Sequence, residues 1–292
     1  MDNLYIKITR LSDNKNFELG NSLDWNVAEN GLENFGTIDN DIISNDNAIT
    51  DGATFSGERV QKRDRTIKAI YRSQQNMDVE RNKMLSFFNI KSLFRVRVIY
   101  GMRDVYADGK IMKFLCDPVH LDRGYLSLTV TFLFANPYWK STNNFGANIA
   151  DVMPLIGFPY MVSQDINPVG LTGGKFNFAK KVNLPNNGDI PTFCTAVFTA
   201  SGKVSNPKLM LHENYVRVID TLTAGDVISM DFTATPPMIK KNGINFIGHC
   251  DRTSQFTKMI LELGDNMISY DADDGTEYLS VYIYYNKLYG AI

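Results

Sequence analysis

The chain has 292 residues, of which 44% are hydrophobic and 21% charged, and its formal net charge is −2. This composition is typical of a folded protein of about two domains, and it excludes a disordered chain. The near-neutral charge gives no bulk attraction to nucleic acid or to an anionic membrane. The opening residues lack the pattern of a signal peptide, and no apolar run reaches the ~20 residues of a membrane span. We therefore expect synthesis in the cytoplasm and no membrane partner.

The first 140 residues predict a β-sheet with one helix. Alternating apolar residues and strand formers recur between turn signals such as Asp13-Asn14 and Gly101. In one of these strands Ile67, Ala69 and Tyr71 share a face. The strands are predicted, in chain order, at residues 4–10, 16–19, 65–71, 94–100, 105–114 and 125–134.

The helix is predicted between the strands at 65–71 and 94–100. Asn76 is the expected N-cap, Asp78 and Glu80 in the first turn suit the helix dipole, and the helix ends near Asn89. The apolar residues at helical spacing are Met77, Met84, Leu85 and Phe88.

Residues 26–57 have a different character. Asn and Asp recur, apolar residues are isolated, and glycines stand at positions 31, 36, 52 and 57. A segment of this length without its own core is uncommon in a compact domain and usually has a functional or partner-contacting role. We expect a long loop or an extended arm with short strands.

The second half predicts an antiparallel β-sandwich of jelly-roll kind. Asn136-Pro137 ends the preceding strand and a polar stretch follows, so domains are expected at 1–140 and 141–292, with the boundary around 138–150. Short strand-like runs alternate with Gly, Pro and Asn turns, and no helical period occurs. These runs are 176–182, 192–199, 208–211, 215–220, 227–232, 243–248, 258–263 and 278–284. The fold class is therefore mainly β, a β-rich α+β chain.

The sequence contains no signature of a common catalytic, cofactor or metal site. GxSxG, GxxxxGK[ST] and HExxH patterns are missing, and the three histidines are His120, His212 and His249. His249 and Cys250 are neighbours, which point to opposite faces of a strand. Residues 271–275 resemble a calcium loop, but Val281 stands where the bidentate acid should be, so a hairpin turn is expected. We predict no catalytic residue, no metal and no cofactor; a hydrolase with acids such as Glu213 would rest on residue type alone.

The three cysteines, Cys116, Cys194 and Cys250, form no Cys-x-x-Cys pair. An odd, widely spaced set argues against a zinc ribbon or a redox motif. Each has apolar or aromatic neighbours, and we expect small buried hydrophobes.

Two residues are weak candidates for a glycan site. His212 and Asn214 resemble the sugar-binding strand of galectins, because alternate residues of a strand share one face. Arg217 lies one residue too far along to share that face, and no tryptophan follows Trp139 to stack on a sugar. A carbohydrate-binding module that recognises host cell-wall polysaccharide stays open as the alternative function.

The basic residues are concentrated in two places, and two interpretations of them are open. They either form a solvated sheet face with bridges to acids, or they mark a subunit interface or a ring lumen that faces passing DNA. Without aromatic interleaving they do not indicate specific nucleic-acid readout. The candidate interface residues are Arg59, Lys62, Arg63, Arg65, Arg95 and Arg97.

Several stretches together resemble the distal tail (Dit) proteins of siphophages, and the resemblance covers nearly the whole chain. The N-terminal domain of that family is matched by Asp51-Gly52-Ala53, residues 59–71, Glu80-Arg81-Asn82, Phe87-Phe88-Asn89 and residues 134–139. Its galectin-like C-terminal sandwich is matched by residues 187–192, Asn206-Pro207 and Ala224-Gly225-Asp226.

The resemblance implies an N-terminal split-barrel-like sheet domain with one helix, followed by a galectin-like jelly-roll. It implies a homo-hexameric ring at the distal end of the tail tube, serving as hub for tail-tip or baseplate proteins. The expected partners are the tail tube protein and a hub protein, with DNA only as passing cargo. The expected location is the virion tail, or a prophage-derived tail-like particle. In such rings part of the N-terminal domain reaches onto the neighbouring subunit, which suits the arm expected at about 26–57.

Overall fold

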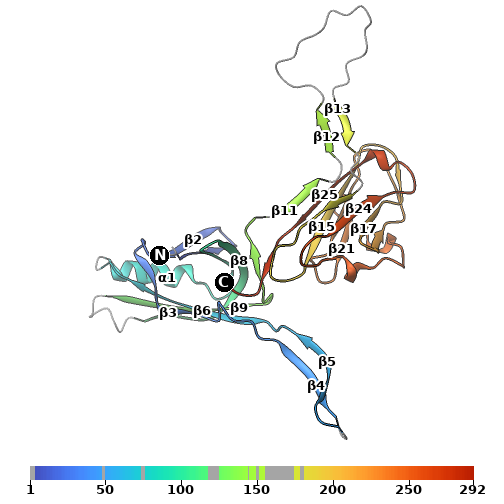
Figure 1. The fold of residues 1–292 in the computed structure, drawn as a ribbon. Helices are drawn as coiled ribbons and strands as arrows, with labels where there is room; N and C mark the ends of the chain where they lie inside the picture. Colours follow the sequence, from blue (N-terminus) through green and yellow to red (C-terminus); the bar gives the residue numbers. More distant parts are fainter. Residues whose placement is uncertain are drawn as a thin grey trace, which may run out of the picture. The chain divides into compact units, whose positions relative to one another are not determined.

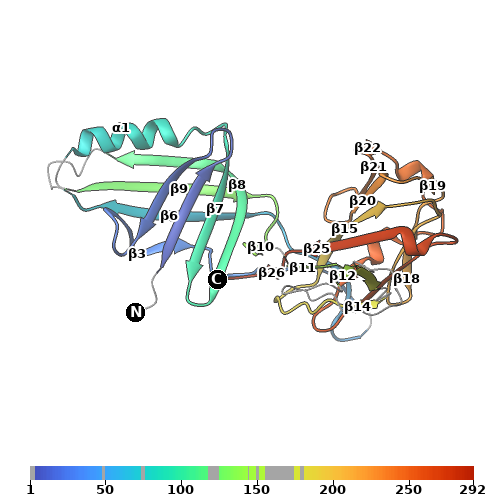
Figure 2. The same cartoon turned by 90° about the horizontal axis from the view of Figure 1, so that it is seen from above.

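The structure is a computed structural model that describes residues 4–47, 50–73, 76–117, 125–143, 145–148, 151–154, 174–177 and 181–292. The chain divides into two compact units (Figures 1 and 2). The first contains residues 1–142 and 288–292, and the second contains residues 143–287. Both are built of antiparallel strands, and the described part of the chain has one α-helix, so the predicted mainly β class is confirmed. No helix in the described ranges is long and apolar enough to cross a membrane.

The first unit is a nine-stranded antiparallel sheet with the order β2-β1-β7-β8-β9-β6-β3, to which β10 and β26 are attached. The two strands predicted on either side of Asp13-Asn14 form a hairpin, in which Tyr5 to Arg10 pair with Gly20 to Lys15. The strands are β1 Tyr5–Arg10, β2 Lys15–Gly20, β3 Trp25–Glu33, β6 Arg63–Tyr71, β7 Leu93–Tyr100, β8 Arg103–Asp117, β9 Leu126–Phe134, β10 Trp139–Ser141 and β26 Leu288–Tyr289.

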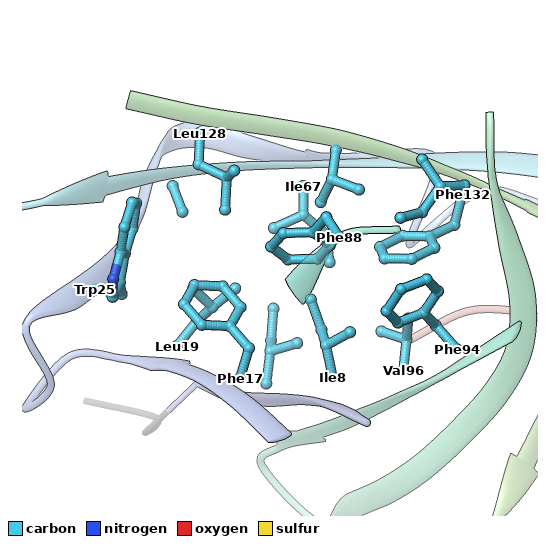
Figure 3. Close-up of a cluster of buried hydrophobic side chains, with 14 of the residues drawn as sticks. Ile8, Phe17, Leu19, Trp25, Ile67, Phe88, Phe94, Val96, Leu128 and Phe132 are labelled. Atoms are coloured by element: carbon cyan, nitrogen blue, oxygen red, sulfur yellow. The ribbon is translucent and has the colours of Figure 1, made fainter. Parts of the chain in front are cut away.

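The core of this unit lies between two halves of the bent sheet. Side chains of β6 and β9 face side chains of β1, β2 and β7 across it (Figure 3). The alternation in the sequence produces this, because every second residue of a strand points inward. As predicted, Ile67, Ala69 and Tyr71 are all buried. Successive aromatic rings, with centroids 5.4 to 6.1 Å apart, connect Trp25, Phe17, Phe88, Phe94, Phe132, Phe134 and Trp139.

The helix α1 (Met77–Phe87) is where it was expected, but two of its details differ. Asn76 has a left-handed backbone, φ 57°, and its side chain makes no capping hydrogen bond. Leu85 is 44% exposed, whereas Met84, Phe87 and Phe88 are buried. Positions 84, 87 and 88 lie on one helical face that packs against the aromatic core, and position 85 is rotated away from it.

The predicted arm is too long at its start. Residues 25–33 form β3, which pairs with β6 inside the sheet. The polar residues 29–31 interrupt the alternation of this strand, so the sequence pattern did not predict it. They lie at a register shift between Val27 and Leu32. Gly31 is required there: a Cβ would lie 2.5 Å from the Lys68 carbonyl oxygen. The arm itself consists of β4 (Asp41–Asp46) and β5 (Ala53–Arg59).

The second unit is a sandwich of a seven-stranded and a four-stranded sheet, with two further strand pairs. The larger sheet contains β11 Phe145–Asn148, β15 Thr192–Ala200, β20 Val227–Asp231, β21 Met238–Lys241, β22 Ile244–Asn245, β23 Ile260–Leu261 and β25 Leu279–Tyr285. The smaller contains β14 Lys181–Asn183, β17 Lys208–Leu211, β18 Asn214–Arg217 and β24 Met267–Asp271. The pairs are β12 Asp151–Pro154 with β13 Gly174–Asn177, and β16 Val204–Ser205 with β19 Thr221–Leu222. Short 3-10 helices span Ile247–His249, Phe256–Lys258 and Thr276–Tyr278.

Apolar side chains of both sheets fill the space between them. Phe198 and Ile283 come from the larger sheet, and Leu209 and Tyr270 come from the smaller. Cys194 belongs to this core, and burial raises the pKa of its thiol to about 12. Cys116 is also buried and Cys250 is half-buried, so these cysteines pack as expected from the sequence.

Residues 288–292 differ from the predicted domain division, because they pack in the first unit. Trp139 and Lys140 of β10 pair with Tyr289 and Leu288 of β26. The Arg103 guanidinium lies 5.0 Å from the centre of the Tyr289 ring, and the Ile292 amide donates to the Phe35 carbonyl. The end of the chain therefore helps to build the first unit.

The aromatic core should dominate the stability of the first unit. Phe132→Ala removes a completely buried ring and is expected to lower the free energy of unfolding by ~3–5 kcal/mol. Phe55→Ala, the matched change at a ring that is 76% exposed on the arm, should cost ~0.5 kcal/mol or less. Urea unfolding followed by fluorescence checks both. Equal losses for the two variants would contradict this placement of the core.

Candidate assembly surface

The arm is a β-hairpin that pairs only with itself among the described residues (Figure 1). It leaves the sheet after β3 and returns to it at β6. Every residue of β4 and β5 is exposed. Both outer edges therefore present backbone groups without a strand partner in the described structure, which is how an edge strand recruits another chain.

One face of the arm carries two exposed apolar side chains. Ile42 pairs with Glu58 and Ser44 pairs with Phe55, so Ile42 and Phe55 lie on the same face. Ile42 is 58% and Phe55 76% exposed, and together with the bulged backbone at Ser56 they line a shallow hollow. Soluble proteins seldom leave apolar side chains clustered in water unless they meet a partner. The sequence drew attention to this segment by its length but not to these two side chains, which stand among Asn, Asp and Ser.

Arg63 fastens the root of the arm. Its side chain is buried, and Nη1 donates to the Thr37 carbonyl oxygen over 2.8 Å. Nη2 lies 3.2 Å from the Asp39 carboxylate. Arg63 thus ties the start of β6 to the segment that leads into β4, and its use as a subunit contact stays a prediction.

Arg65 was expected at a subunit interface, and this expectation is wrong. Its side chain is completely buried, with the guanidinium 4.3 Å from the Trp139 ring centre and 4.9 Å from that of Phe134. Nη2 donates to the Pro137 carbonyl oxygen over 2.6 Å. Burial, aided by the charge of Arg63, lowers the pKa of Arg65 to about 10. Alternation along β6 places this residue inside, where it ties the strand to the stretch before β10.

Arg95 and Arg97 form ion pairs on the outer face of β7 and β8. Arg95 donates two hydrogen bonds to Asp108, over 2.7 and 2.8 Å, and Arg97 donates two to Asp104, over 2.8 and 2.6 Å. Both side chains stay partly exposed. The interpretation as a sheet face bridged to acids is confirmed for these two, and a subunit or lumen role stays a prediction.

Arg59 and Lys62 lie at the surface of the arm and its root. Arg59 is 3.5 Å from the Asp41 carboxylate across the hairpin, and 70% of its side chain is exposed. Lys62 lines a polar hollow at the root together with Asp39 and Asp64. Their positions suit a partner contact, which stays a prediction.

The candidate glycan residues do not share a strand face. His212 lies in the two-residue turn between β17 and β18, with φ 53°, and Asn214 pairs with Leu211 to close that turn. The expected alternation of His212 and Asn214 is therefore wrong. The His212 ring lies 3.5 Å from the buried Asn266 amide, and Arg217 forms an ion pair with Asp273. The galectin-like strand is thus interrupted by a turn.

The other residues considered for catalysis or metal binding are His249, His120 and residues 271–275. His249 stacks on Phe246 with ring centres 3.9 Å apart. Residues 271–275 connect β24 of one sheet to β25 of the other, so the expected hairpin is wrong there. Within the described ranges no three His, Cys, Asp or Glu side chains form a metal-ligating group. His120 lies outside the described residues.

The Arg97–Asp104 pair should make stability depend on pH. Hydrogen bonds from Arg97 lower the pKa of Asp104 below its ordinary value. The stabilisation is therefore complete above the unfolded-state pKa of ~3.9 and is lost as the pH falls through the lower folded-state value. Asp104→Asn should cost about 1 kcal/mol or less at neutral pH, because the pair is partly exposed, and nothing at low pH. Urea midpoints across this range test it against Glu29→Gln, a change at an exposed acid; a cost for Asp104→Asn that persists at low pH would contradict it.

Loss of the Arg63 side chain should make the arm more mobile. Arg63→Ala removes the hydrogen bonds to Thr37 and Asp39, and hydrogen exchange at residues 37–46 is expected to become roughly tenfold faster or more. Lys62→Ala, at the exposed neighbour, should leave exchange unchanged. If the two variants exchange alike, Arg63 does not fasten the arm.

Comparison with known proteins relates the chain to phage tail and baseplate proteins. Residues 187–289 match the model of the siphovirus-type tail component, C-terminal domain. Comparison with curated proteins gave no significant match. The chain is structurally similar to the Dit (gp 19.1) protein of phage SPP1, described as a paradigm of hub adsorption apparatus in Gram-positive infecting phages. That match has a TM-score of 0.64 and 11% identity over 97% of this chain and 98% of the other.

It is also similar to chains of the phage P2 baseplate in its activated conformation with Ca and with Sr, with TM-scores of 0.55 and 0.54. Both matches have 11% identity and cover 100% of each chain. The resemblance to distal tail proteins, drawn first from short stretches of sequence, is confirmed. Residues 187–289 thus carry the C-terminal domain of siphovirus-type tail components, and the chain as a whole has the fold of Dit and baseplate proteins.

Proposed function

We propose that this structural tail protein forms a homo-hexameric ring at the distal end of the tail tube. In this role it is a hub that joins the tube protein to tail-tip or baseplate proteins, and DNA crosses the ring as cargo. It is made in the host cytoplasm and works in the virion tail or in a prophage-derived tail-like particle. One observation carries the proposal: the arm, a hairpin with every strand residue exposed and an apolar face formed by Ile42 and Phe55.

A closed ring needs two unlike surfaces on each subunit, which meet head to tail. The arm supplies one of them. It is too thin to have a core of its own, since a lone two-stranded hairpin is marginally stable in water. A neighbouring subunit would cover Ile42 and Phe55 and pair or shield the open strand edges. Such a contact explains why a chain of ordinary composition keeps these side chains in water as a monomer.

The sandwich unit suits a docking role. Its described residues bring together no sugar-binding strand at His212 and Asn214, so glycan binding through them has no structural support. Cys250, the half-buried thiol next to His249, has its pKa raised to about 11 by burial, which disfavours a reactive thiolate. We therefore propose a non-enzymatic platform for other tail or baseplate proteins.

Removing the arm tests the ring. A variant in which a short Gly-Ser linker replaces residues 41–59 should be monomeric under conditions in which the unchanged chain forms hexamers. Its urea midpoint should stay the same, because no residue of β4 or β5 is buried. Native mass spectrometry and negative-stain images of six-fold rings provide the measurement. His212→Ala is the control and should leave the hexamer intact.

Two results would overturn the proposal. One is an unchanged chain that stays monomeric at high concentration. The other is an arm-deleted variant that still forms rings.

A further inference from the structure

The arm has more negative charge than its own surroundings neutralise. Between residues 38 and 59 the sequence contains four Asp and one Glu against the single base Arg59. Asp41 pairs with Arg59, and Asp39 with Arg63 at the root. Asp46, Asp51 and Glu58 form no ion pair with any described residue, although Glu58 accepts a hydrogen bond from Asn40. Three unneutralised acids are therefore distributed along a hairpin whose strands are about 20 Å long.

Several basic side chains of the first unit are already paired with acids. Lysines and arginines of β1, β2, β6, β7 and the helix pair with acids of the same unit. Lys62 and Arg72 are exposed bases without an ion-pair partner among the described residues, and so are three lysines, Lys91, Lys110 and Lys113. The three lysines are also close together. Leu93 and Lys110 are direct cross-strand partners, Lys91 lies two residues before Leu93, and Lys113 lies three residues after Lys110.

The same place is apolar as well as basic. Ile90 is 62%, Leu93 41% and Met112 59% exposed, and all three lie beside the lysines. We call this surface, formed by residues 90–93 and 110–113, the lysine corner. Its two short sequences, Ile90-Lys91-Ser92-Leu93 and Lys110-Ile111-Met112-Lys113, contain no acid. It thus combines three free positive charges with exposed apolar side chains.

The arm and the lysine corner are complementary in both respects. One has three unpaired acids beside Ile42 and Phe55, and the other has three unpaired lysines beside Ile90, Leu93 and Met112. Lys110 and Asp64 at the arm root both pair with Leu133, so the lysine corner lies two strands from the root, whereas the unpaired acids of the arm lie on the hairpin beyond it. Unlike patches that match each other are what a head-to-tail contact requires, and charge complementarity selects the partner surface.

We propose that the arm of one copy docks on the lysine corner of the next copy. The apolar face of the hairpin covers Ile90, Leu93 and Met112, while Asp46, Asp51 and Glu58 meet Lys91, Lys110 and Lys113. The inference rests on the proposed ring and names the surface that receives its arm. Because the charges lie at the rim of the contact, they set specificity and salt dependence more than total affinity.

Charge reversal tests this docking. Lys110→Glu/Lys113→Glu should weaken the hexamer by roughly tenfold or more in dissociation constant, since like charges then face the arm. Adding Asp46→Lys/Asp51→Lys to the same chain should recover most of the loss. Lys203→Glu/Lys258→Glu changes the net charge equally at two exposed lysines of the second unit and should have no effect. Circular dichroism and urea midpoints confirm that each variant folds.

A second measurement locates the contact directly. Phe55→p-benzoylphenylalanine places a photo-cross-linker on the apolar face of the arm, at a side chain exposed enough to accept it. Illumination of the assembled protein should link it to residues 90–93 or 110–113 of another copy, read by mass spectrometry.

The outcomes separate the two proposals. If the hexamer forms but neither responds to the lysine variants nor links to these residues, the arm docks elsewhere and only this inference is overturned. If the unchanged chain never assembles, the proposed ring is overturned and this docking with it.

Discussion

The first unit depends on strand β6, which both completes the aromatic core and supports the arm. β6 pairs with β9 on one side and β3 on the other, and its inward residues Ile67, Ala69 and Tyr71 face the core. Arg63 and Arg65, near its start, both point into the fold. Arg63 donates to the Thr37 carbonyl before the arm, and Arg65 donates to the Pro137 carbonyl before β10. A hairpin with no core of its own is thus attached to a largely buried strand in the interior of the sheet. The arm can then have a defined root while its tip stays in water.

The interior of the first unit is stabilised by buried aromatic rings, whereas its outer surface carries the charged side chains. Inside, rings in contact from Trp25 to Trp139 stabilise the sheet, and aromatic pairs add about 0.5–1.5 kcal/mol each beyond the burial of their surface. Outside, several charges of the sheet are neutralised in place, as in the Arg95–Asp108 and Arg97–Asp104 pairs. Acids on the arm and three lysines at one corner are among the charges that have no ion-pair partner in the described residues. The arm and the corner are two unlike surface patches, which the proposed head-to-tail contact requires.

The sandwich shows how a resemblance of residue types can mislead about function while remaining correct about fold. His212 and Asn214 match a galectin-like pattern in sequence, yet the chain turns between them. The His212 ring is in contact with the side chain of Asn266 instead. The fold is nevertheless the one that the resemblance implied, as the structural match over 97% of this chain shows. Two sheets need only alternation and turns, whereas a binding site needs particular side chains to share a face. A single tight turn is enough to separate them.

The sequence by itself determined the mainly β class, the helix after β6, most strands of the sheet and the existence of an arm. These follow from local alternation, capping residues and turn formers, which act over a few positions. Only the tertiary structure decided which arginines are free. Arg65 is buried beneath Trp139, Arg95 and Arg97 are paired across a hairpin, and none of this is visible in the spacing of charges. The structure also separated β3 from the arm, because pairing with β6 overrides the polar run at residues 29–31. Long-range pairing and burial set these outcomes, and they depend on residues that lie far apart in the chain.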